Sequence, residues 1–140
     1  TIQAHIISMY LPFLFGGILI AWLGIRRLVW VGVVLLFAAI GTTYLNSGFQ
    51  HYWWALVLLG VGWNFLFLAS SAWVSNSFSG PERFLAQGTS DTLVFGTQSI
   101  ASLAAGWLLF AVGWKSLVLL PIPLLLVTLV MSVTRVSSAK

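Results

Sequence analysis

The chain has 140 residues, of which 60% are hydrophobic and only 6% are charged, and its formal net charge is +4 at pH 7. A water-soluble domain carries charge on roughly a quarter of its residues, so this composition excludes an ordinary soluble fold and indicates a lipid-embedded one. The few basic residues lie singly or in pairs between apolar runs, which argues against nucleic-acid binding.

Apolar runs long enough to cross a membrane tile nearly the whole chain. A helix needs about 20 apolar residues to cross ~30 Å of hydrocarbon. This length predicts about five membrane-spanning helices, over residues 5–23, 28–45, 52–73, 91–112 and 116–133. We therefore expect an all-α fold, a polytopic bundle of transmembrane helices. Prolines that can kink a helix fall inside the first and last runs, at Pro12, Pro121 and Pro123.

Short turn-forming segments separate most of these runs. Arg26 and Arg27 end the first run, because guanidinium groups enter hydrocarbon only at a high cost in free energy. Residues 46–48, Asn-Ser-Gly, predict the next turn, and residues 113–115, Gly-Trp-Lys, predict the last one.

The most polar stretch, residues 79–90, predicts the longest loop. Ser90 or Asp91 would then be the N-cap of the fourth helix, since both residue types accept hydrogen bonds from free helix N–H groups. Asp91 is interpreted as such a cap or as a partner of Arg83, and an ion-coupling role is the alternative.

The basic residues predict the orientation of the bundle. Connections this short make neighbouring helices antiparallel, so alternate loops lie on the same side of the membrane. Lys115 falls on one side, and the other side collects Arg26, Arg27, Arg83, Arg135 and Lys140. By the positive-inside rule the second side is cytoplasmic, with the C-terminus, and Thr1 lies on the outer side.

Polar side chains at membrane depth are the best pointers to function, because they are costly to bury unless they are paired or hydrated. Asn64 lies near the middle of the third run and Gln98 about two turns into the fourth. Gln98 shares a helix face with Asp91 and Ser102, which suits a wet cavity. The alternative is that Asn64 and Gln98 only hydrogen-bond a neighbouring helix.

Two further features of the apolar runs bear on packing and on the cavity. Gly60 and Gly62 are small residues of the kind that let membrane helices approach closely. His5 and Met9 lie one helical turn apart, so they can face the same cavity, although the outer boundary would equally let His5 contact water.

Metal and catalytic sites are not predicted. The chain has no cysteine and only two acidic residues, so thiolate ligands are excluded and no nucleophile has an evident base. His5 and His51 do not have the spacing of a metal-binding pair. We expect no cofactor and no metal, and an integral membrane enzyme is the least favoured class.

Residues 17–27, Gly-Ile-Leu-Ile-Ala-Trp-Leu-Gly-Ile-Arg-Arg, resemble a loop signature of the major facilitator superfamily. That signature reads Gly-x-Leu-x-Asp-Arg-x-Gly-x-Arg-Arg and joins the second and third helices, with a weaker copy between the eighth and ninth. Ala21 and Trp22 replace the Asp and the first basic residue, which favours the weaker copy. Residues 80–88 resemble the loop between the tenth and eleventh helices, and residues 59–67 resemble bacterial drug-transporter-like members.

This resemblance implies helices eight to twelve of a twelve-helix transporter, which works by alternating access about a site near the midplane. It implies a substrate cavity lined by His5, Met9, Asn64 and Gln98. It places Arg26, Arg27, Arg83 and Asp91 at cytoplasmic gate loops. A start at Thr1 without a signal-peptide pattern also leads us to expect a fragment. The implied partners are the lipid bilayer, a small-molecule substrate and a missing N-terminal half, in a bacterial inner membrane.

Secondary transport of a small solute is the leading functional hypothesis. The alternative is a non-transporting membrane subunit or assembly factor, in which the same polar residues only fasten helices together.

Overall fold

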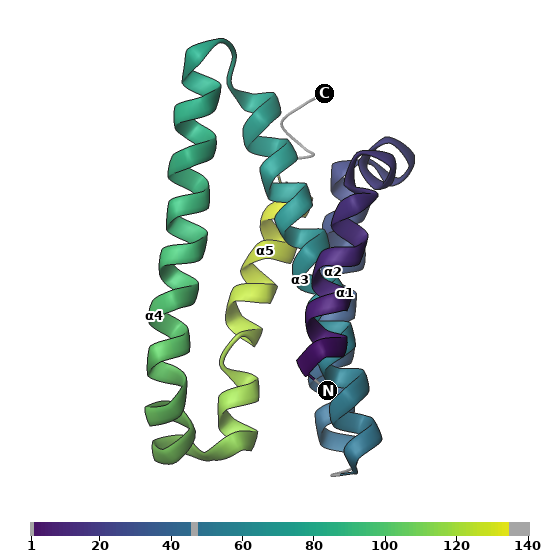
Figure 1. Cartoon of the computed structure of the whole chain (residues 1–140), viewed down its shortest axis with the longest axis vertical. Coiled ribbons are helices and arrows are strands. Elements are labelled where there is room, and N and C mark those ends of the chain that lie inside the picture. The colour runs from purple at the N-terminus through teal and green to yellow at the C-terminus, as the bar shows by residue number, and fades with distance from the viewer. Residues whose placement is uncertain (1, 46–47, 135–140) are drawn as a thin grey trace. The chain divides into compact units, whose positions relative to one another are not determined.

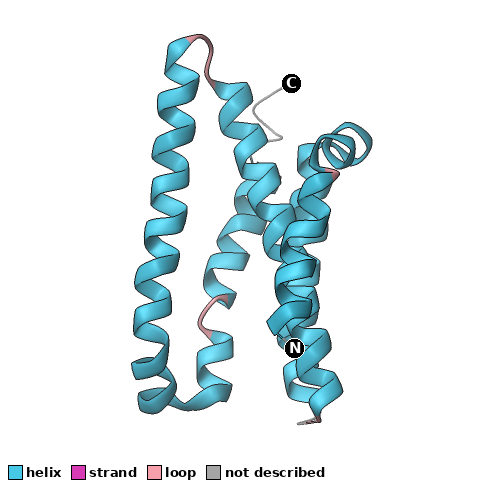
Figure 2. Cartoon of the chain, viewed as in Figure 1, coloured by secondary structure: helices cyan, strands magenta, loops and turns pink. Residues whose placement is uncertain are grey.

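A computed structural model of the chain describes residues 2–45 and 48–134. The described residues form helices joined by short turns, without a strand among them (Figure 2). In chain order the helices are α1 (Ile2–Leu14), α2 (Gly16–Leu45), α3 (Phe49–Ser77), α4 (Pro81–Leu119) and α5 (Ile122–Thr134) (Figure 1). The predicted all-α membrane bundle is confirmed.

Two glycines interrupt the long helices α2 and α4. Gly24 has φ 73° and ψ 155°, and Gly113 has φ 76° and ψ 165°. A residue with a Cβ rarely adopts such angles, whereas glycine does so at little cost. Both glycines fall where the sequence predicts turns. Each of these turns is a sharp break within a long helix (Figure 1).

The first and last predicted runs are interrupted near their prolines. The run over 5–23 is divided at Phe15, whose N–H donates to Pro12 O at 3.1 Å in a tight i to i−3 bond. The run over 116–133 is divided between Leu119 and Ile122, around Pro121. Proline lacks an N–H and crowds the preceding turn, which explains the break around Pro121. Helix α1 continues through Pro12 to Leu14, so the break at Phe15 follows the proline and is not explained in this way.

The loop predicted over residues 79–90 is correct at Ser79 and Gly80 and wrong from Pro81 onward. Helix α4 begins at Pro81, and Gly80, with φ 60°, precedes it as the N-cap. Proline suits the first helical position, and Glu82 places a negative charge near the N-terminal end of the helix dipole. The N-cap predicted at Ser90 or Asp91 is wrong as well, since both residues lie well inside α4.

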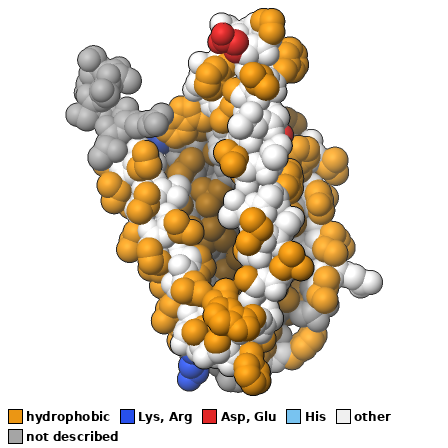
Figure 3. Space-filling view, turned by 90° about the vertical axis from the view of Figure 1, so that its left-hand side faces the viewer, with side chains coloured by type: hydrophobic (Ala, Val, Ile, Leu, Met, Phe, Trp, Pro, Cys, Tyr) orange, Lys and Arg blue, Asp and Glu red, His pale blue; other side chains and the backbone are white. Residues whose placement is uncertain are grey.

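Three stretches of described helix are long and apolar enough to cross a membrane, Gly16–Leu45, Phe49–Ser77 and Pro81–Val133. Only 11% of the most apolar window of the third stretch is buried. Hydrophobic side chains are spread over the whole face shown in Figure 3, with few charged groups among them. So much exposed apolar surface requires lipid, and the chain is an integral membrane protein.

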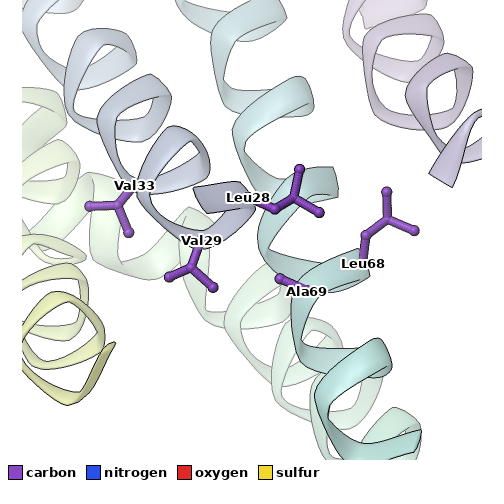
Figure 4. Packing of buried hydrophobic residues seen from close by; sticks show 5 residues of the cluster. All are labelled: Leu28, Val29, Val33, Leu68 and Ala69. Atoms are coloured by element: carbon purple, nitrogen blue, oxygen red, sulfur yellow. The ribbon is translucent and has the colours of Figure 1, made fainter. Parts of the chain in front are cut away.

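Packing divides the chain into two compact units, Thr1–Ala69 with Pro121–Lys140, and Ser70–Leu120. The core of the first unit is a cluster of buried side chains from α2 and α3, shown in Figure 4: Leu28, Val29, Val33, Leu68 and Ala69. Leu129 of α5 packs against this cluster. The second unit joins the end of α3 to α4.

Helices α2 and α3 approach closely at a pair of glycines. A Cβ on Gly32 would lie 3.1 Å from Gly62 O, and a Cβ on Gly62 would lie 3.1 Å from Gly32 O. Small residues at such crossings are the usual packing device in membranes. The role predicted for Gly62 is confirmed, whereas sequence reasoning did not identify its partner Gly32.

Candidate functional site

Two polar side chains connect α1 to α3. The Nδ2 atom of Asn64 donates a hydrogen bond to Met9 O at 2.6 Å, and Nδ1 of His5 lies 2.7 Å from Leu56 O. Because a carbonyl oxygen can only accept, the proton of this second bond belongs to His5 Nδ1. The structure therefore brings together three of the four residues predicted for the cavity.

Gly60 makes this close approach of α1 and α3 possible. A Cβ at Gly60 would lie 2.9 Å from His5 O and 3.2 Å from Met9 N, and it would collide with the hydroxyl of Ser8. That hydroxyl is already bound, since it donates to His5 O at 2.7 Å. The packing role predicted for Gly60 is therefore confirmed.

Asn64 is buried, but only one of the two polar atoms of its side chain has a hydrogen-bond partner among the described residues. Its side chain is 1% exposed, and its Oδ1 atom has no hydrogen-bond partner among the described residues. Leaving a buried acceptor unpaired costs about 1–3 kcal/mol. One end of the amide fastens two helices, as the structural alternative requires, and the other end offers an acceptor, as a binding role requires.

Gln98 lies on α4, in the second unit, and its side chain is exposed. No hydrogen bond of its side chain is seen within residues 2–45 and 48–134. A shared cavity formed by Gln98 with His5, Met9 and Asn64 stays a prediction.

Asp91 has a different partner from the one predicted. Gln87 Nε2 donates to Asp91 Oδ1 at 3.0 Å and to Ser71 Oγ at 2.9 Å, so the Gln87 amide links the last part of α3 to α4. Arg83 lies eight positions before Asp91 on the same helix, about 12 Å along its axis, which is too far for an ion pair. Sequence reasoning missed Gln87 because it fell inside the predicted loop.

The arginines predicted for the gate lie at exposed positions near helix breaks. Arg26 and Arg27 follow the break at Gly24, and Arg83 lies in the first turn of α4. Arg135 and Lys140 lie outside the described residues. The cytoplasmic placement of these groups stays a prediction. Within the described ranges, no three His, Cys, Asp or Glu side chains group so as to hold a metal ion.

The chain is similar to a curated protein named riboflavin transporter RfnT, from Brucella anthropi. The two are 38% identical over 136 residues, which is 96% of this chain and 34% of the relative. The chain thus spans about a third of the length of the curated relative that it matches. No protein-family model matches the chain. No solved structure matches it either.

Proposed function

We propose that this chain is part of a secondary transporter of the major facilitator type, which moves a small solute across the bacterial inner membrane by alternating access. The observation that carries the proposal is the 38% identity, over nearly the whole chain, to a protein named as a riboflavin transporter. The resemblance of residues 17–27 to the loop signature supports the major facilitator type, and the order of the helical runs is compatible with the C-terminal part of such a protein.

The substrate that we propose is riboflavin or a compound with a similar flat, nitrogen-containing ring system. The name of the relative supports this class. The chain supplies polar groups that a neutral substrate of this kind requires, namely amides and an imidazole within apolar helices: His5, Asn64 and Gln98. A neutral ring needs hydrogen bonds and apolar contact instead of a fixed counter-charge.

The breaks in the helices are compatible with alternating access. The chain leaves regular helical geometry at Gly24, Gly113 and around Pro121. Such points can absorb changes of backbone angle while the helices between them move as rigid segments. Arg26, Arg27 and Arg83 would lie at the cytoplasmic gate.

Uptake of labelled riboflavin into liposomes that contain the full-length protein tests this proposal. We expect saturable uptake, which Asn64→Ala and Gln98→Ala reduce while the protein still folds. Thr128→Val is a matched control, since among the described residues the Thr128 hydroxyl bonds only Leu124 O of its own helix, at 2.9 Å. Absence of uptake by folded, unmutated protein, for riboflavin and related rings alike, would refute the proposal.

A non-transporting membrane subunit is the second candidate. The observation that favours it is that Asn64 and His5 each bond a backbone carbonyl of a neighbouring helix, which is all that a fastening role requires. In that case Asn64→Ala lowers the stability of the protein, and no solute is taken up by any variant.

A further inference from the structure

Asn64 offers a hydrogen-bond acceptor in an apolar setting where water is scarce. Two buried side-chain atoms lack a partner among the described residues, Asn64 Oδ1 and His51 Nδ1. His51 lies in the first turn of α3, near the predicted membrane boundary, where water is at hand. Asn64 lies in the middle of the same helix, and only 1% of it is exposed.

The orientation of the Asn64 amide follows from its partner. Met9 O can only accept, so the amide nitrogen must face it and the oxygen must be the unpaired atom. The nearby hydroxyl of Ser8 is not free to donate to Asn64, because it bonds His5 O. The Oδ1 atom therefore requires a donor that does not belong to the described residues.

We propose that Asn64 Oδ1 accepts a hydrogen bond from a ring N–H of the transported substrate, an inference that rests on the proposed function. Riboflavin carries an imide, in which one N–H lies between two carbonyl groups. A side-chain amide is the matching partner: its oxygen accepts from the imide N–H, and its NH₂ group donates to a flanking carbonyl. The substrate class is a flat ring with an imide edge.

This pairing also couples binding to helix movement. The amide is covered by α1 while its nitrogen bonds Met9 O, so the substrate reaches Asn64 only when α1 moves away from α3. The imide carbonyl then replaces Met9 O as the acceptor of the Asn64 NH₂ group. Helix α1 is short and ends at the break before Gly16, and the hydrogen bonds of His5 and Asn64 to backbone carbonyls must break before it can move away from α3.

The test compares riboflavin with 3-methylriboflavin, in which a methyl group replaces the imide hydrogen. Uptake and equilibrium binding, the latter by flavin fluorescence, are measured on the full-length protein. We expect unmutated protein to bind and transport riboflavin at least roughly tenfold better than the methyl analogue, since the analogue leaves Oδ1 unpaired. Asn64→Leu should abolish this preference, because it weakens the binding and uptake of riboflavin alone. Thr128→Val should retain the preference.

The outcomes separate the inference from the function on which it rests. If unmutated protein takes up neither compound, the proposed function fails. If it takes up both equally well, transport stands and the inference is overturned, even if Asn64→Leu does not fold. A preference that persists in Asn64→Leu also overturns it, because another group then recognises the imide.

Discussion

Asn64 illustrates what can be predicted for a single residue. Its depth in the membrane is evident from the apolar residues around it, and so is its need for a partner. Its actual partner, Met9 O, was not predictable, because every residue has a backbone carbonyl and this one lies 55 positions away. The unpaired Oδ1 atom follows only from that contact.

Gly60 provides a residue-scale prediction about packing. Gly60→Ala should lower the free energy of unfolding by about 1–3 kcal/mol, because the new methyl group would crowd His5 O and the Ser8 hydroxyl. Gly96→Ala is the control, since a Cβ there meets nothing within 4 Å, and it should be neutral or stabilising by up to about 1 kcal/mol. Thermal unfolding of full-length protein in detergent measures both. Equal effects would contradict the close packing of α1 on α3.

Gln87 provides a second prediction at this scale. Gln87→Leu removes the bonds to Ser71 and Asp91 and should destabilise the contact between the end of α3 and α4 by about 1 kcal/mol. Backbone hydrogen exchange in residues 70–77 should then be faster by several fold. Thr89→Val is the control, because within the part of the chain that the structure describes the Thr89 hydroxyl bonds only Leu85 O of its own helix. Unchanged exchange in Gln87→Leu would show that the link does not hold these segments together.

At the scale of elements, apolar runs predicted where the helices lie but not where they begin. The stretch over 79–90 looked like a loop because it is polar. The backbone hydrogen bonds of a helix do not need apolar side chains, so a helix can continue beyond its apolar part. Pro81 and Glu82 are residue types that favour the start of a helix. The polarity of the stretch favoured a loop more strongly, so the start of α4 was not predicted. The break around Pro121 was more predictable, because proline removes a backbone donor from the turn.

Gly24 forms the break inside α2 with backbone angles that favour glycine. Gly24→Ala forces a Cβ into a backbone conformation that is nearly exclusive to glycine and should destabilise the protein by about 1–3 kcal/mol. Gly17→Ala lies in the same helix, without positive φ and without a neighbour within 4 Å, and should have little effect. Chemical denaturation of the two variants in detergent compares them. Equal stability would show that the turn does not depend on glycine.

At the scale of the whole molecule, composition alone predicted that lipid surrounds the chain. With so few charged residues the chain cannot cover its surface against water, and the exposed apolar side chains of α4 show this directly: Leu103, Trp107 and Phe110 are 85%, 71% and 94% exposed. The distribution of basic residues predicts the orientation of the bundle. Orientation is a property of the chain in its membrane.

The proposed transport function requires a defined membrane topology, which cysteine labelling measures. This chain has no cysteine of its own, so single cysteines can be placed at Arg27 and Ser79, beside the arginine-bearing turns, and at Ser116, beside Lys115. Any cysteine elsewhere in the full-length protein is first replaced. With a membrane-impermeant reagent on intact cells, we predict labelling at position 116 and none at positions 27 and 79 until the cells are opened. Labelling of positions 27 and 79 from outside, or of all three positions from the same side, would contradict the account.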